Sequence, residues 1–122
     1  MKPETQEWVE IADEDLRAAN GLLGLGLSAQ VAFHCQQAVE KLLKALMTEA
    51  DLPAPRIHDL VELAGLMRLD LTEAQRLLLT RLSYQVVASR YPGPARRYTV
   101  EEVQEVLIQT GKLVAWLRAK LT

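Results

Sequence analysis

The amino-acid sequence predicts an all-α protein, an antiparallel up-and-down bundle of four long helices and one short helix. Apolar residues recur at steps of three and four almost from end to end, which is the spacing of one helix face. No stretch of useful length alternates apolar and polar residues, as a half-buried strand would. Short connections between long helices favour antiparallel neighbours. The length of 122 residues fits a single domain spanning residues 1–122.

The first two helices are expected over residues 4–23 and 28–50. Gly24 and Gly26 separate them, because two glycines in three residues favour a turn. Ser28 is the expected N-cap of the second helix. The first helix has one mainly apolar line: Trp8, Ala12, Asp15, Ala19 and Leu22. The second has two: Val31, Cys35, Ala38, Leu42 and Ala45, and Val39, Leu43, Leu46 and Ala50. A helix with two apolar lines should be largely buried.

Three further helices are expected in the second half of the chain. Two prolines shortly after residue 50 exclude a continuous helix, and a short helix follows over residues 58–67. Thr72-Glu-Ala-Gln75 matches the capping-box pattern and opens a fourth helix that extends to about residue 89. The prolines and glycine of residues 90–98 predict an irregular loop. Thr99-Val-Glu-Glu102 is a second capping box, which opens a fifth helix reaching the last residues.

Composition excludes several classes of function. The net charge of −2 and pI near 5.7 argue against a protein that binds long nucleic acid through an overall positive charge. Without an apolar signal segment or a long apolar stretch, the chain is expected to be cytoplasmic. Cys35 is the single cysteine and is expected to be a small buried hydrophobe. With only two histidines besides, neither a metal nor another cofactor is expected.

The second helix also carries a polar stripe, whose members are His34, Gln37, Lys41, Lys44 and Thr48. His34 could act as a general base or phosphate ligand, or could be a groove histidine bonded to a neighbouring helix. Gln37, Lys41 and Lys44 could form a polar wall for an anionic ligand. A solvated helix face is the alternative, in which Glu40 and Glu49 partly offset the lysine charges.

Asp15 interrupts the apolar line of the first helix, where an apolar side chain would pack better. Burying an unpaired carboxylate costs several kcal/mol, so a partner is required, such as Lys41, Arg90 or a backbone amide. A structural ion pair and an acid that orients a ligand are both open interpretations.

The loop after the fourth helix gathers cations and aromatics: Arg90, Tyr91, Arg96, Arg97 and Tyr98. Guanidinium groups bind phosphate and tyrosines stack on bases, so the loop could form part of a nucleotide site. The alternative is a solvated loop in which Arg90 meets the carboxyl end of the helix. We expect the loop to fold toward the His34 to Lys41 part of the stripe, giving an electropositive pocket. His58 is expected to cap the short helix or tether its loop.

Four segments together resemble the HEPN family, the higher eukaryotes and prokaryotes nucleotide-binding domain. They are Trp8-x3-Ala12-x2-Asp15-Leu16-x2-Ala19, the continuous run from Ala32 to Ala45, His58-Asp-Leu60 and Arg90-Tyr-Pro92. The run from Ala32 to Ala45 is the most specific of them. The resemblance implies a helical bundle, usually dimeric, of a branch often encoded beside a minimal nucleotidyltransferase in toxin–antitoxin-like modules.

Many other HEPN proteins are metal-independent ribonucleases, marked by an arginine and, after four to six residues, a histidine near the end of a late helix. Arg90 lies about where that arginine is expected, but no histidine follows it, since the only histidines are His34 and His58. We therefore expect no catalytic residues and a dimeric interaction protein that pairs with a nucleotidyltransferase and binds a nucleotide or an RNA end. The alternative is a metal-independent ribonuclease that uses His34 and Arg90.

Spare apolar surface is a second reason to expect a homodimer. The second helix has two apolar lines, and the fifth adds Val106, Leu113 and Trp116 beside its main stripe. These are more apolar faces than a monomer is expected to cover.

Overall fold

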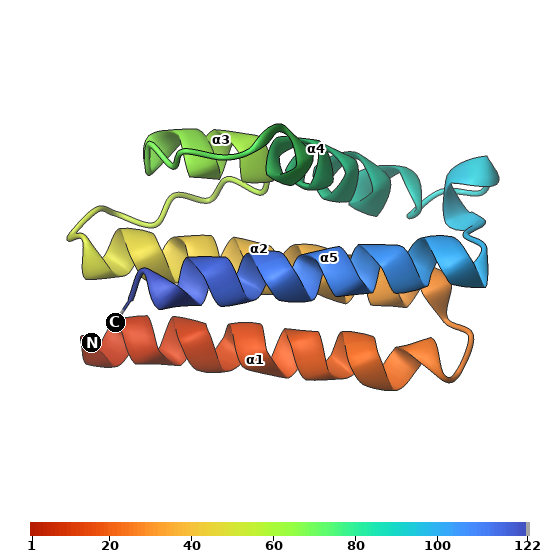
Figure 1. The fold of residues 1–122 in the computed structure, drawn as a ribbon, viewed down its shortest axis with the longest axis horizontal. Coiled ribbons are helices and arrows are strands. Elements are labelled where there is room, and N and C mark those ends of the chain that lie inside the picture. The colour runs from red at the N-terminus through yellow and green to blue at the C-terminus, as the bar shows by residue number, and fades with distance from the viewer. Residues whose placement is uncertain (122) are drawn as a thin grey trace.

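A computed structural model describes residues 1–121, which form five α-helices and one short 3-10 helix. In order these are α1 (Pro3–Leu23), α2 (Ser28–Glu49), α3 (Leu60–Leu66), α4 (Glu73–Ala88), η1 (Pro94–Arg96) and α5 (Val100–Ala119). The four long helices alternate in direction, and both ends of the chain lie at one end of the molecule (Figure 1). The predicted all-α, up-and-down bundle is confirmed. None of the described helices combines the length and hydropathy needed to cross a bilayer.

Helix α2 is the centre of the bundle. It contacts α1, α3, α4 and α5, and both of its predicted apolar lines are buried apart from Ala50, which lies beyond the helix. Figure 1 shows α1 and α5 running alongside α2, with α3 and α4 forming a separate layer above them. Because α2 is covered on several sides, a polar residue on it needs a partner within the protein or must face a gap between neighbouring helices.

The predicted capping boxes at the starts of α4 and α5 are both present. The Thr72 hydroxyl accepts a hydrogen bond from the backbone N–H of Gln75 at 3.1 Å, and the Gln75 side chain accepts one from the Thr72 N–H at 2.9 Å. Thr99 and Glu102 make the equivalent pair at 3.1 and 3.4 Å. Each box satisfies two backbone donors that a helix start would otherwise leave unpaired.

Other helix boundaries differ from the prediction. Leu27, and not Ser28, occupies the N-cap position of α2, where its carbonyl accepts from the Val31 N–H at 3.0 Å. The short helix α3 begins at Leu60, because the Asp59 side chain caps it by accepting from the Glu62 N–H at 3.1 Å. His58 therefore lies before the cap. The loop predicted to be irregular contains the 3-10 helix η1.

The apolar faces offered as spare dimer surface are covered within one chain. Val106 and Leu113 are 2% and 3% exposed, and Trp116 is half-buried against the core. The reasoning that derived a dimer from these residues was wrong, because α5 packs against α1, α2 and α4 at once. Large apolar side chains are instead exposed along α4 and just after it: Leu77, Tyr84, Val87 and Tyr91.

Candidate functional site

A hollow of about 480 Å³ lies between α2, the segment that leads into α3, and the carboxyl end of α4. Helix α2 contributes residues one turn apart, while Arg90 comes from the turn immediately after α4. The lining residues are Phe33, Gln36, Gln37, His58, Asp59, Ser83, Val86, Val87 and Arg90. This hollow brings a guanidinium, an aromatic ring, two amides and an imidazole together from three separate segments.

Glu40 forms a buried ionic centre next to this hollow, with no side-chain surface exposed. Its Oε1 accepts hydrogen bonds from His58 Nδ1 at 2.8 Å and from Gln36 Nε2 at 3.2 Å. Its Oε2 lies 2.9 Å from Lys41 Nζ and 3.4 Å from Lys44 Nζ. Burial alone would raise the pKa of Glu40, but the bonds from Lys41, His58 and Gln36 outweigh it and hold that pKa at about 2. Glu40 is therefore an anion at neutral pH.

Lys44 lies inside the protein. This position contradicts the interpretation in which the polar stripe is a solvated helix face. The Lys44 side chain is 8% exposed, and its ammonium shares Glu40 with Lys41 while sitting 5.9 Å from the centre of the Trp8 ring. A buried ammonium requires such compensation, and the carboxylate and the aromatic face supply it. Glu40, placed on the solvated face by the same interpretation, is the residue that makes the burial of Lys44 possible.

Asp15 has a partner from another helix, as its position in the apolar line required. That partner is His34, whose Nδ1 lies 2.9 Å from Asp15 Oδ1, and not Lys41 or Arg90. The pair joins α1 to α2 and is partly exposed, at 16% for the Asp15 side chain and 29% for His34. Neither member lines the hollow. The interpretation of His34 as a groove histidine bonded to a neighbouring helix matches this geometry.

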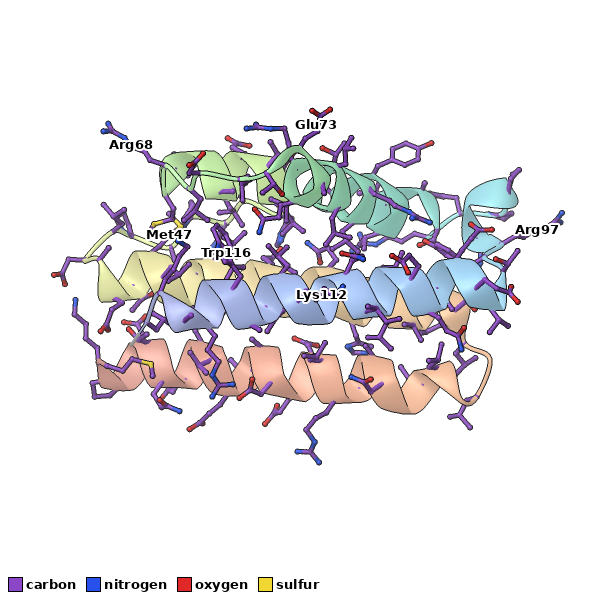
Figure 2. All side chains as sticks on the ribbon, viewed as in Figure 1. Met47, Arg68, Glu73, Arg97, Lys112 and Trp116 are labelled. Carbon is purple, nitrogen blue, oxygen red and sulfur yellow. The ribbon has the colours of Figure 1, made fainter. Side chains whose placement is uncertain are left out.

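The predicted electropositive pocket is formed only in part. Gln37 and Arg90 line the same hollow, whereas Lys41 is engaged by Glu40. None of the other predicted loop residues lines it: Tyr91, Arg96 and Arg97 are exposed, and Tyr98 is half-buried against the core. Figure 2 shows Arg97 projecting away from the bundle beyond η1. The loop turns outward at Gly93, whose φ of 143° suits a residue without a side chain. Asp59 adds a carboxylate to the lining, so the hollow is mixed in charge.

Only Gln37 and Arg90 of the hollow were predicted as ligand contacts, and the sequence analysis missed the other seven lining residues, including Phe33, Gln36 and His58. Phe33 and Gln37 are four residues apart and so lie one above the other on α2. Gln36, Glu40 and Lys44 repeat at the same spacing, and this polar line between the predicted polar stripe and the Val39 line was the available signal. His58 was expected to tether a loop, and its bond to Glu40 is such a tether.

His58 is held in one orientation by Glu40. Because Glu40 is ionised, His58 Nδ1 carries the proton that is donated to it, and Nε2 is left as the acceptor or proton-binding atom. The His58 side chain is 76% exposed, so this second nitrogen is open to solvent and ligands. A carboxylate that fixes an imidazole in this way is also the arrangement used to orient a general base.

Neither a metal site nor a reactive thiol is found in the described part of the chain. No group of three or more His, Cys, Asp or Glu side chains within residues 1–121 is placed to hold a metal ion. Cys35 is buried, and this burial raises the pKa of its thiol to about 11. A thiol with that pKa is protonated at neutral pH and inert.

The comparisons with known proteins agree with this architecture. The model of the HEPN domain family matches residues 5–120. The chain belongs to the HEPN domain family. Within it, this HEPN protein is similar to TT1696 from Thermus thermophilus, with 31% identity over 98% of this chain and 99% of that one and a TM-score of 0.81. It also shares its fold with ST0689, an archaeal HEPN homologue, at 23% identity, full coverage of both chains and a TM-score of 0.81. No curated protein matches the chain.

Proposed function

We propose that this HEPN domain is a non-catalytic interaction protein that binds a nucleotide, free or at the end of an RNA chain, in the hollow between α2 and α4. The observation that carries the proposal is the convergence of Arg90, Gln37 and Phe33 on that hollow. A guanidinium binds phosphate through two parallel N–H donors, and an aromatic ring stacks on any base. Among the described side chains, no carboxylate forms an ion pair with Arg90, so its donors are available.

The proposed partners are a second copy of the chain and a minimal nucleotidyltransferase, in a toxin–antitoxin-like module. The proposal of a nucleotidyltransferase partner rests on the family resemblance. Co-purification of a nucleotidyltransferase with this protein from the native host would support that partner. The homodimer is supported by the exposed side chains of Leu77, Tyr84 and Val87 on α4. Leu77 and Tyr84 are seven residues apart, the spacing of one helix face that can pair with another helix.

Sedimentation velocity at micromolar concentration is expected to give a dimer for the wild-type protein. Replacing Leu77 and Tyr84 together by glutamate should shift it to a monomer, because the charges would oppose burial of this face. Replacing the exposed Ile108 on α5 by glutamate is the matched control and should leave the dimer intact. A wild-type monomer under these conditions would contradict the proposal.

Arg90 is the residue whose loss should most reduce nucleotide binding. Charge-assisted hydrogen bonds contribute about 1.5–3 kcal/mol, so Arg90→Ala should weaken the affinity for AMP by roughly ten- to hundredfold. Arg97→Ala is the control, since Arg97 is an exposed arginine of the same loop that does not line the hollow. Calorimetric titration measures both. Equal losses of AMP affinity in the two variants, or no binding of millimolar AMP by the wild type, would contradict the proposed nucleotide site.

Cleavage of RNA is the second candidate function, and one observation changes which histidine it would use. His34 is bonded to Asp15 and does not line the hollow with Arg90, whereas His58 does. A ribonuclease built here would use His58 Nε2 as general base, with Glu40 holding the ring. Incubation of RNA with wild type and with His58→Ala separates the candidates: equal background cleavage supports a binding protein, and cleavage lost in the variant supports the enzyme.

A further inference from the structure

We infer that His58 is a binding residue of the hollow, and that it meets the phosphate of the ligand in its protonated form, as a second cation beside Arg90. The inference rests on the nucleotide binding proposed above and adds one residue and one proton to it. His58 and Arg90 both line the hollow, although they come from different segments of the chain. Binding of the phosphate should therefore be accompanied by the uptake of a proton.

The buried Glu40 decides which nitrogen of His58 is available to a ligand. His58 Nδ1 lies 2.8 Å from Glu40 Oε1, and the Glu40 side chain is ionised and has no exposed surface. An ionised carboxylate only accepts, so Nδ1 carries a hydrogen whether or not the ring is charged. The second proton is taken up at Nε2, which points away from Glu40. Protonation thus adds a positive charge to the exposed side of His58 and keeps the bond that holds the ring.

The other ionised side chains that line the hollow offset each other. Among its described lining residues they are Arg90, which follows α4, and Asp59, which precedes α3. The remaining lining residues of α2 and α4 are uncharged. With a neutral His58 the lining therefore carries no net charge. Protonation of His58 is the change that makes it positive and suited to an anion.

Three further charges act on His58 from α2, behind the lining. The carboxylate of Glu40 contacts the ring directly and favours its protonated form. Lys41 and Lys44 oppose protonation, but their ammonium groups bond the other carboxylate oxygen, Oε2, at 2.9 and 3.4 Å. Together the three leave one positive charge beside the hollow, which also favours an anionic ligand.

A nucleotide phosphate shifts this balance toward the protonated ring. A phosphate monoester carries about 1.5 to 2 negative charges at neutral pH, more than the single guanidinium of Arg90 neutralises. A phosphate oxygen close to Nε2 stabilises the charged imidazole, because an opposite charge nearby favours the ionised form. Linkage makes the effect reciprocal, so the protonated ring binds the phosphate more tightly by the same factor.

His34 is the matched control within the same chain. It is the only other histidine, and its Nδ1 is likewise bonded to a carboxylate, that of Asp15, at 2.9 Å. Neither residue of this pair lines the hollow. Protonation of His34 should therefore not respond to a ligand bound between α2 and α4.

Proton NMR of the two imidazole rings, with and without millimolar AMP, tests the inference on the wild-type protein between about pH 5.5 and 8, where histidines change charge. AMP should raise the midpoint of the His58 titration by roughly 0.5 to 1 pH unit. That rise corresponds to roughly three- to tenfold tighter binding by the protonated ring, the size expected for a charged hydrogen bond at an exposed site. The midpoint of His34 should stay where it is.

The variants His58→Asn and His34→Asn supply a second measurement. Asparagine keeps an N–H donor near the position of Nδ1 but takes up no proton in this pH range. On lowering the pH from about 8 to about 5.5, the AMP affinity of the wild type relative to His58→Asn should rise by roughly threefold or more. The ratio to His34→Asn should stay constant. The phosphate of AMP itself titrates in this range, but its contribution is common to all three proteins and cancels from the ratios.

The outcomes separate the inference from the proposal on which it rests. AMP binding that leaves the His58 midpoint unchanged, or that moves both histidine midpoints equally, would overturn the inference and leave the proposed nucleotide site standing. A constant affinity ratio between wild type and His58→Asn would do the same. Absence of AMP binding at every pH would instead overturn the proposed function.

Discussion

Replacing Glu40 by alanine is expected to lower the free energy of unfolding by about 3–5 kcal/mol. The substitution removes the single carboxylate shared by Lys41 and Lys44 and the acceptor for His58 and Gln36. Lys44 would then be a buried ammonium without an anion, which is the costly outcome of breaking a buried ion pair. Urea denaturation followed by circular dichroism measures the loss.

Two variants test the physical reason for that loss. The double variant Glu40→Leu, Lys44→Met removes both buried charges together and should recover much of the stability, because well-packed apolar replacements of buried pairs are often neutral. Asp15→Ala breaks the other carboxylate–histidine pair, which is partly exposed, and should cost roughly 1–3 kcal/mol. If Glu40→Ala lowered the free energy of unfolding by less than Asp15→Ala does, the buried contacts of Glu40 would not be the main stabilising interactions of this part of the bundle.

Acid should destabilise the protein through the same residue. The pKa of Glu40 is about 2 in the folded protein and 4.5 as its ordinary value, so its ionised form stabilises the fold fully above pH 4.5. As the pH falls through 4.5 toward 2, the unfolded chain takes up a proton more readily than the folded one. About 3 kcal/mol of stability should be lost over that interval, at about 1.36 kcal/mol for each pKa unit.

Glu40→Gln isolates this contribution to the acid dependence. The variant has no carboxylate at position 40, so its unfolding free energy should fall less steeply between pH 4.5 and 2 than that of the wild type. Glu49 remains in both proteins, and its pKa is also lowered, chiefly by the backbone N–H of Lys2 and the hydroxyl of Thr5. If the unfolding free energies of the two proteins fell equally steeply with pH, the assignment of the acid dependence to Glu40 would be contradicted.

Helix positions could be predicted from the sequence because they depend on local rules. Periodicity of apolar residues and the capping boxes at Thr72 and Thr99 act within a few residues, and the helices formed close to their expected bounds. Errors occurred where two local signals competed. At the start of α3, Asp59 and not His58 is the cap, because its carboxylate reaches the Glu62 N–H.

The candidate site was less predictable because it depends on which helices cover α2. Glu40 and Lys44 look like a solvated pair in the sequence, and only the packing of α1 and the segment at His58 against that face makes them buried. Arg90 was correctly expected near Gln37, since a residue that follows α4 directly cannot lie far from the helix end. Arg96 and Arg97 follow the turn at Gly93, whose direction the sequence does not specify.

A titration of AMP into 15N-labelled protein, followed by NMR, tests the location of the ligand most directly. The nucleotide site predicts that the largest shift changes occur at the backbone amides of Phe33 and Gln37, the Gln37 side-chain amide and the Arg90 guanidinium. The residues of the separate hollow between α1 and α5, such as Leu16, Asn20 and Ile108, should not respond. Changes centred on that second hollow, or none at millimolar AMP, would contradict the account.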